Sequence, residues 1–365
     1  MSVVSAQRPR AYLSIQQLRA VAALGVVVFH IDTQLFRMGY EGYWPNFLSS
    51  GVDIFFIISG FIMWITTCGR PTTPIQFMWN RITRIVPLYW IMTALALAVL
   101  LVKPDLVQTG ALDWGHVLKS FLFIPAVHPA AGTMEPLIVP GWTLNYEMMF
   151  YLIFAATLFL PARFRLPTAI AALIALAAVR LFDPTPLTVP WFYSSDIILE
   201  FGMGLLIGAL VTTGRKAPAA LALPLVLVGA IALAVVGEWH EEVSRTLVRG
   251  IPAALIVLGA VSLELDGRVL KSRLVSYFGD ASYSIYLAHG IALSAISQLW
   301  RRLLDETNPA SWAGFTIVSL VLCTLSGVIV YETIERPIAK LIKGRRRRVS
   351  ERAPVMQSKA PATGG

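Results

Sequence analysis

The chain has 365 residues, of which 56% are hydrophobic and only 14% are charged, and its mean hydropathy is +0.67. Because soluble domains carry about 25% charged residues, this composition excludes an ordinary soluble protein and predicts a polytopic membrane protein. The net charge of +9 does not by itself indicate nucleic acid, since basic residues gather in the cytoplasmic loops of membrane proteins. The two cysteines, Cys68 and Cys323, and the five histidines show no spacing that predicts a metal site.

The first apolar segment, residues 18–36, carries an ionisable residue near each end. It follows a short tail, residues 1–17, and no small-residue cleavage site follows it, so we interpret it as a retained membrane span rather than a signal peptide. Arg19 and His30 are eleven positions apart, which on an α-helix places them on one face, roughly 16 Å apart along the axis. Ionisable residues within a membrane span are costly and indicate a functional site by default.

Nine further apolar segments follow, at about 51–67, 85–102, 142–160, 166–182, 196–212, 217–236, 248–263, 283–300 and 312–332. Every backbone polar group in lipid must bond within its own segment, so these segments are predicted to be helices. A half-apolar piece at 117–127, inside the long loop 103–141, is too short to cross a bilayer. The predicted fold class is therefore all-α, a polytopic membrane helix bundle of about ten transmembrane helices in a single domain, residues 18–342.

The distribution of basic residues predicts the orientation of this bundle. Ten spans place both termini on one side, and 22 of the 30 Lys and Arg residues then lie on that side, against 8 on the other. The positive-inside rule assigns the richer side to the cytoplasm, so both termini are expected there. Residues 343–365 form a basic, disordered cytoplasmic tail in this interpretation, and the run Lys343 to Arg348 is expected to face anionic lipid rather than nucleic acid.

Three arginines are predicted at the cytoplasmic level of the bundle. Arg19 begins the first span, and Arg81 and Arg84 lie just before the third. Arginine binds phosphate oxygens through a planar fork, so the group suits a phosphate-rich donor that arrives from the cytoplasm. Arginines that flank spans are more often topology signals, and that alternative stays open.

A histidine and two carboxylates are predicted near the outer level. His30 lies toward the outer end of the first span, Asp53 in the first turn of the second, and Glu147 early in the fourth. Histidine suits proton transfer because its reference pKa is near 6.5. The alternatives are a satisfied core histidine and, for Asp53, a carboxylate that caps a helix. His289 in the ninth span is predicted to lie toward the inner side.

Six sequence motifs, in order from about residue 12 to residue 340, resemble one family of membrane enzymes. The motifs are SIQQLRAVAALGVVVFH, GVDIFFIISGF, RITRIVPLYW, GWTLNYEMMFY, SYSIYLAH and the final ERP. Each piece alone is a weak signal, but the ordered set is specific. The sequence resembles the acyltransferase-3 family of bacterial integral-membrane O-acyltransferases, and most of all its exopolysaccharide-modifying acetyltransferases.

The resemblance implies acyl-CoA as a cytoplasmic co-substrate, with no permanently bound cofactor, and O-acylation of a carbohydrate or similar hydroxyl. The family's pattern of Arg or Lys, ten residues and His falls on Arg19 and His30, and its R-x-x-R pattern falls on Arg81 and Arg84. The acidic residue of its W-T-L-x-x-E motif falls on Glu147. Some members carry a fused esterase-like domain, and a relay through such a domain is not expected here.

The sequence thus predicts an O-acyltransferase of the bacterial inner membrane. It would transfer acetyl from acyl-CoA to a hydroxyl of a surface or exported polysaccharide or its lipid-linked precursor. His30 is the predicted base, Glu147 or Asp53 orients it, and the three arginines hold the CoA phosphates. Trp142 and Tyr146 are predicted to bind the acceptor, or to anchor the chain at the membrane interface.

Two alternative functions remain at this stage. A secondary transporter also places ionisable residues inside a bundle, although no internal repeat is evident between the halves of this sequence. A non-catalytic partner of the polysaccharide export or assembly machinery would have a degenerate site, whereas the set of Arg19, His30 and R-x-x-R is unbroken. The sequence leaves open the acyl group, the acceptor hydroxyl, direct transfer or an acyl-enzyme, and the oligomeric state.

Overall fold

The computed structural model describes residues 12–102, 112–239, 243–304, 308–342 and 344. Within these residues every regular element is a helix, there is no strand, and one isolated β-bridge joins Val127 to Met134. The described α-helices are α1 Leu13–Arg37, α2 Gly51–Thr67, α3 Pro74–Val102, α4 Trp114–Phe121, α5 Gly141–Thr157, α6 Ala162–Ala178, α7 Val189–Tyr193, α8 Leu199–Thr212, α9 Ala219–Val236, α10 Ile251–Leu265, α11 Arg273–Leu303 and α12 Pro309–Val330. Two short π-helical turns, Thr246–Gly250 and Tyr331–Glu335, adjoin α10 and α12.

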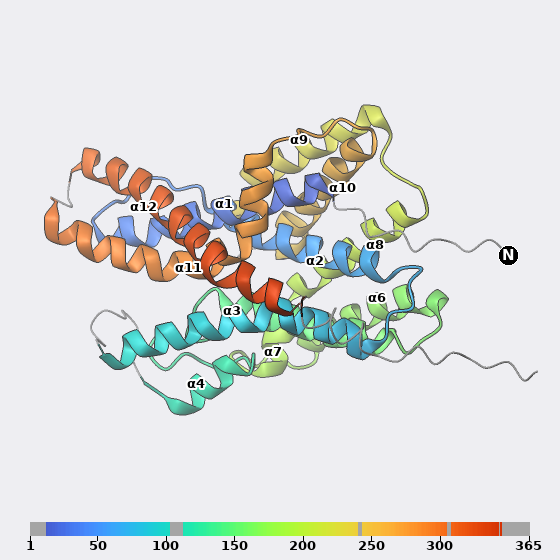
Figure 1. Ribbon diagram of the computed structural model, residues 1–365, viewed down its shortest axis with the longest axis horizontal. Coiled ribbons are helices and arrows are strands. Elements are labelled where there is room, and N and C mark those ends of the chain that lie inside the picture. Colours follow the sequence, from blue (N-terminus) through green and yellow to red (C-terminus); the bar gives the residue numbers. More distant parts are fainter. Residues whose placement is uncertain (1–11, 103–111, 240–242, 305–307, 343, 345–365) are drawn as a thin grey trace, which may run out of the picture.

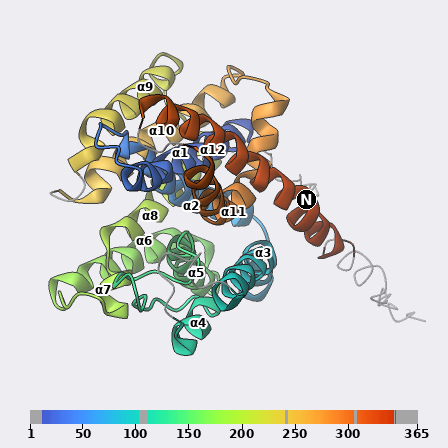
Figure 2. The same ribbon diagram turned by 90° about the vertical axis from the view of Figure 1, so that its left-hand side faces the viewer.

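The long helices form a bundle that is elongated along the helix axes (Figure 1). Seen along this direction, α1, α9, α10, α11 and α12 gather on one side and α3 to α7 on the other, with α2 and α8 between them (Figure 2). The most extensive helix contacts are those of α9 with α10, α2 with α8, α1 with α11 and α11 with α12. Helices that are far apart in the sequence, such as α1 and α11, therefore share one wall of the bundle.

Glycines permit the closest helix crossings. A β-carbon added to Gly60 in α2 would lie 2.0 Å from the carbonyl oxygen of Phe201 in α8. The same crossing is seen from α8, where a β-carbon on Gly204 would lie 2.0 Å from the Ile57 carbonyl oxygen. Small residues at helix interfaces let backbones approach in this way in membrane bundles. These glycines bring α2, which carries Asp53, firmly against α8.

Each of the ten predicted spans overlaps one of these helices. In the described part of the chain, 7 helical segments are long and apolar enough to cross a membrane. Of the other three predicted spans, α5 has 17 residues and α8 has 14, and α11 is 31 residues long but rich in serine, tyrosine and charged residues. The protein is an all-helical, multi-pass membrane protein, whereas the count of ten spans and the cytoplasmic termini stay predictions.

The ends of the elements differ from the predicted ranges in ways that affect the site. α1 begins at Leu13, within the stretch predicted as a tail, and residues 1–11 lie outside the described residues. α3 begins at Pro74, eleven residues before the predicted span, so the R-x-x-R pair lies on the helix itself. The predicted basic tail, 343–365, lies outside the described residues except for residue 344.

Candidate active site

The bundle contains two adjoining cavities, and residues of α1 line both of them. Arg19 lines an inner cavity of about 340 Å³, whereas His30 lines an outer cavity of about 540 Å³. Val52 and Tyr286 line both cavities, so the two adjoin there. The names inner and outer follow the predicted orientation. The two ionisable residues of α1 thus face two neighbouring compartments.

The inner cavity collects the three arginines that the sequence grouped. Arg19 comes from α1, and Arg81 and Arg84 come from α3, where their spacing of three places them on one face. The Arg81 guanidinium lies 5.7 Å from the centre of the Phe77 ring, and its Nε atom is buried without a hydrogen-bond partner among the described residues. Three cations around one cavity suit a ligand that carries several negative charges.

Glu147 lies in the inner cavity with these arginines rather than beside His30. Its carboxylate accepts hydrogen bonds from the hydroxyls of Ser59, at 3.0 Å, and of Tyr151, one turn further along α5. Within the described residues the carboxylate makes no hydrogen bond to His30. The geometry therefore places Glu147 in the inner cavity with the arginines, and its predicted role as the partner of His30 has no contact to support it.

Asp53 is fully buried and is bonded to an arginine. Its two oxygens accept hydrogen bonds from Nε and Nη2 of Arg245, at 2.9 and 2.8 Å, in a bidentate ion pair. This geometry joins α2 to the segment that leads into the π-helical turn before α10. In the part of the chain that the structure describes, Asp53 makes no hydrogen bond to His30 either.

Among the described residues, one of the two ring nitrogens of His30 forms a hydrogen bond. Its Nδ1 atom lies 2.9 Å from the Val26 carbonyl oxygen, one helical turn earlier. A carbonyl oxygen only accepts, so Nδ1 carries the proton and Nε2 presents a lone pair. The side chain is half-buried and lines the outer cavity. His30 is thus held in the tautomer that a general base requires.

The ring beside His30 belongs to a second histidine. The centre of the His289 ring lies 4.9 Å from that of His30, with the two ring planes at 67°. Nδ1 of His289 bonds to the Tyr286 carbonyl oxygen at 2.6 Å, and its Nε2 is buried without a partner among the described residues. His289 was predicted toward the inner side and His30 toward the outer, but the structure places the two rings side by side, so they do not lie at separate levels. Because α11 begins at Arg273, ten residues before the predicted span, His289 lies roughly 24 Å along it.

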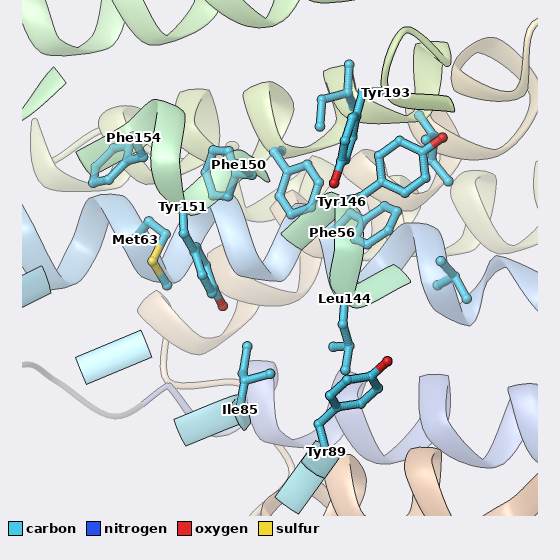
Figure 3. Close-up of a cluster of buried hydrophobic side chains, with 14 of the residues drawn as sticks. Phe56, Met63, Ile85, Tyr89, Leu144, Tyr146, Phe150, Tyr151, Phe154 and Tyr193 are labelled. Atoms are coloured by element: carbon cyan, nitrogen blue, oxygen red, sulfur yellow. The ribbon is translucent and has the colours of Figure 1, made fainter. Parts of the chain in front are cut away.

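The structure separates the two aromatic residues that were predicted to bind the acceptor. Trp142 lines the outer cavity with His30. Tyr146 lines neither cavity, because its ring stacks on Phe192 at 4.4 Å and its hydroxyl donates to the Phe192 carbonyl oxygen. Figure 3 shows Tyr146 beside Phe56 within the buried aromatic cluster. Trp142 is therefore placed to contact a ligand, whereas Tyr146 is placed to pack.

The boundary between the cavities carries two hydroxyl groups. The Tyr286 hydroxyl lies 3.0 Å from the Thr143 hydroxyl and donates to the Pro140 carbonyl oxygen at 3.2 Å. Tyr286 and His289 come from the SYSIYLAH motif on α11, and Thr143 comes from the start of α5. Two of the recognised motifs thus meet where the cavities adjoin.

Sequence reasoning missed two charged residues of the outer cavity, Arg245 and Arg249. Both were counted only as basic residues on the predicted outer side, where few such residues lie. Because basic residues are scarce there and the positive-inside rule gives an outer arginine no role in orientation, these two could have been predicted as functional residues. Their spacing of four on a helical segment was a second signal, because it places both on one face.

Comparison with known proteins assigns the chain to a family. The acyltransferase domain of the acyltransferase-3 family matches residues 12–328. The exopolysaccharide production protein ExoZ of Rhizobium meliloti is 39% identical over 312 residues, which cover 83% of this chain and 92% of ExoZ. The O-acetyltransferase OatA of Staphylococcus aureus is 21% identical over 371 residues, which cover 91% of this chain and 58% of OatA. No solved structure matches the chain.

The match spans nearly all the described helices, including those that carry both cavities. It therefore favours an enzyme over the transporter that was considered from the sequence. The chain belongs to the acyltransferase-3 family and is a multi-pass membrane acyltransferase.

Proposed function

We propose that this protein is an O-acetyltransferase that takes acetyl from acyl-CoA in the inner cavity and transfers it to a hydroxyl of a polysaccharide, or of its lipid-linked precursor, in the outer cavity. The observation that carries the proposal is that the arginines and His30 line two different but adjoining cavities. Arg19 and His30, on one helix, line separate cavities that adjoin at Val52 and Tyr286. Transfer from a nucleotide thioester to an alcohol requires a group that binds the donor phosphates and a group that accepts the proton of the alcohol. Arg19 and His30 suit these two roles.

The donor is expected to lie with its phosphates against Arg19, Arg81 and Arg84. A guanidinium fork binds phosphate oxygens bidentately, and charge-assisted bonds of this kind are about twice as strong as neutral ones. Arg19 and His30 are roughly 16 Å apart along α1. The extended pantetheine arm of CoA would carry the thioester from the arginines toward the boundary at Tyr286.

The chemical step in this proposal is general-base transfer. Nε2 of His30 removes the proton of the acceptor hydroxyl as its oxygen bonds to the thioester carbonyl carbon. The carbon–sulfur bond then breaks, and the CoA thiolate takes the proton back from His30, so the base is restored. Direct transfer uses only groups in the two cavities. The Tyr286 hydroxyl, at their boundary, would donate to the oxyanion that forms on the carbonyl oxygen once its single proton turns away from the Pro140 carbonyl oxygen.

His289 acts as a positioning residue in this scheme. Its buried ring packs against the His30 ring and restricts the directions in which Nε2 of His30 can point. Glu147 would act on the donor side, where its carboxylate offsets part of the positive charge of the arginines. A carboxylate partner for His30 of the triad kind is not required, because the Val26 carbonyl oxygen already fixes the tautomer.

The acceptor class follows from the relatives. One is named an exopolysaccharide production protein and another an O-acetyltransferase. Trp142 in the outer cavity offers an aromatic face of the kind that sugar rings pack against. With the termini cytoplasmic, the protein would lie in the bacterial inner membrane and act on the glycan as or after it crosses, in contact with the polysaccharide assembly machinery.

The test is acetylation of the surface polysaccharide. Cells that produce the wild-type protein, cells that lack it and cells that produce His30→Gln at equal level are compared by mass spectrometry of the isolated polysaccharide. A gain of 42 mass units per acetyl group should appear with the wild type alone. An identical acetyl content in all three would refute the proposal, provided that the protein is present in the membrane fraction.

A further inference from the structure

The outer cavity holds two arginines that the proposed reaction does not use. Arg245 immediately precedes, and Arg249 lies within, the π-helical turn Thr246–Gly250, and both line the cavity with His30. π-Helical turns are rare and often occur at functional sites. These arginines are also on the predicted outer side of the membrane, where orientation does not call for basic residues.

Arg249 is buried and its hydrogen bonding is incomplete. Its side chain is among the largest that are fully buried, with 1% of its surface exposed. Nε donates to the Gly237 carbonyl oxygen at 2.8 Å and Nη1 donates to the Ser49 hydroxyl at 2.7 Å. Nη2 is buried without a partner among the described residues. A buried charged donor with no acceptor is costly, so the guanidinium is poised to bind a ligand oxygen.

Arg249 forms no ion pair among the described residues, although Asp53, Glu238 and Glu200 lie near enough to interact with it electrostatically. Asp53 is bonded bidentately to Arg245, which already forms a complete ion pair. Glu238 lines the same cavity but accepts the backbone N–H of Phe47 at 2.9 Å. In the part of the chain that the structure describes, Arg249 forms no ion pair with either carboxylate.

One more carboxylate lines the cavity, that of Glu135 in the segment before α5. Burial raises the pKa of this carboxyl above its ordinary value, although a hydrogen bond from Thr133 opposes the shift. Desolvation therefore disfavours negative charge at Glu135. The positive charge of Arg249, partnered only by neutral oxygens, faces a space of about 540 Å³, which is within the range of small-molecule sites.

We propose that Arg249 binds an oxyanion of the acceptor, a carboxylate or phosphate group carried by the glycan, and thereby places a nearby hydroxyl at His30. This inference rests on the proposed function and names the class of acceptor that the outer cavity selects. Arg245 lies four residues away, but its charge is already paired with Asp53, so Arg249 is the cation that this proposal uses. A neutral glycan would leave Nη2 of Arg249 unsatisfied, whereas an acidic one would satisfy it.

The test measures binding of small sugars without any donor, in full-length protein purified in lipid nanodiscs. The ligands are glucose, glucuronate and glucose 6-phosphate, each titrated calorimetrically. Wild-type protein should bind at least one charged sugar about 10-fold or more tightly than glucose, since charge-assisted bonds to arginine are of that order. The glucuronate and phosphate titrations distinguish a carboxylate-bearing glycan from a phosphate-bearing one.

Substitution of Arg249 should remove this preference. In Arg249→Gln the ratio of the glucose Kd to the charged-sugar Kd should fall to near one, and Arg249→Lys should keep part of it because a point charge replaces a fork. Ser49→Ala removes the hydroxyl that accepts from Nη1 and should reduce the ratio by a smaller factor without deleting a charge. The matched control is Arg165→Gln, because Arg165 also donates to backbone carbonyls but lies outside both cavities.

Three outcomes would overturn the inference. The first is a wild-type protein that binds glucose as tightly as the charged sugars or binds neither. The second is an Arg249→Gln protein, correctly folded by size-exclusion profile, that keeps the full preference. The third is an Arg249→Gln protein that keeps the sugar preference but, in a separate titration with acetyl-CoA alone, loses affinity for it, which would place Arg249 with the donor. Because no donor is present in the titrations, the preference can hold or fail independently of acetyl transfer.

Discussion

Replacement of His30 by glutamine tests whether proton transfer and donor binding depend on different residues. Glutamine keeps a similar volume and hydrogen-bonding capacity but cannot carry a proton back and forth near neutral pH. Loss of positioned acid–base catalysis should lower kcat by a factor of about 10² to 10⁴, or about 2.7 to 5.4 kcal/mol in the activation barrier. Donor affinity should change by less than about twofold, because Arg19 is roughly 16 Å away along α1, beyond the Debye length.

The assay uses purified full-length protein in nanodiscs, radiolabelled acetyl-CoA and polysaccharide from cells that lack the protein. Initial rates give kcat, and equilibrium binding of a non-hydrolysable acetyl-CoA analogue gives donor Kd. Phe29→Leu is the matched control, because Phe29 adjoins His30 on α1 and lines the same cavity without a titratable group. A His30→Gln protein with full kcat would refute the base assignment, and a large loss of donor affinity would refute the division into two cavities.

The contact between His30 and His289 adds a further test of the same reasoning. His289→Gln should lower kcat by a smaller factor than His30→Gln and should alter the pH profile of kcat, since the ring that holds His30 is removed. The double variant should be little slower than His30→Gln alone, because residues that act as a unit are non-additive. Additive losses, with an unchanged pH profile in His289→Gln, would show that His289 is only structural.

Three other predictions follow from the cavities and the topology. Arg84→Ala should weaken donor binding about 10- to 150-fold, and Arg84→Lys should recover part of the loss. An unchanged donor Kd in Arg84→Ala would favour the alternative that Arg84 only orients the chain in the membrane. Asp53→Asn should destabilise the protein by about 1.5 to 3 kcal/mol in thermal unfolding, because it leaves the half-buried Arg245 without its ion-pair partner, and an unchanged unfolding temperature would contradict this. A reporter fused after Lys359 should report cytoplasm and one inserted in loop 103–141 should report the outside, and the same side for both would refute the span count.

The order and approximate position of the membrane-length helices could be predicted from the sequence, whereas the beginnings of α1, α3 and α11 could not. Apolar runs of membrane length mark the helices, and the second predicted span, 51–67, coincides with α2. The shared face of Arg19 and His30 follows from helical geometry alone. The grouping of Arg81 and Arg84 with Arg19 in one cavity was also predicted, although from an inferred common depth rather than from a known contact.

Contacts between helices could not be predicted in the same way. Depth along the membrane follows from position in a span, but the direction in which a side chain points depends on how helices pack, and no local pattern encodes that. Asp53 and Glu147 were assigned to His30 because all three were predicted near the outer level. The structure bonds Asp53 to Arg245, 192 residues away, and turns Glu147 into the inner cavity. The position of His289 was predicted incorrectly because the first ten residues of α11 are too polar to be recognised as part of an apolar span.

The separation of the two cavities has a physical reason if His30 is the base. A guanidinium 5 Å from an imidazole would oppose its uptake of a proton by about 3 kcal/mol at an effective dielectric of 20, and three such groups would make it a poor base. At roughly 16 Å, the separation of Arg19 from His30 along α1, the same interaction is about 1 kcal/mol before salt screening, and less after it. In the proposed function the three arginines of the inner cavity would therefore hold the donor phosphates away from His30. Of the two arginines in the cavity of His30, Arg245 is already paired with Asp53, and Arg249 would be paired by the acceptor oxyanion. Tyr286 and Val52, which line both cavities, mark the place where that end would cross.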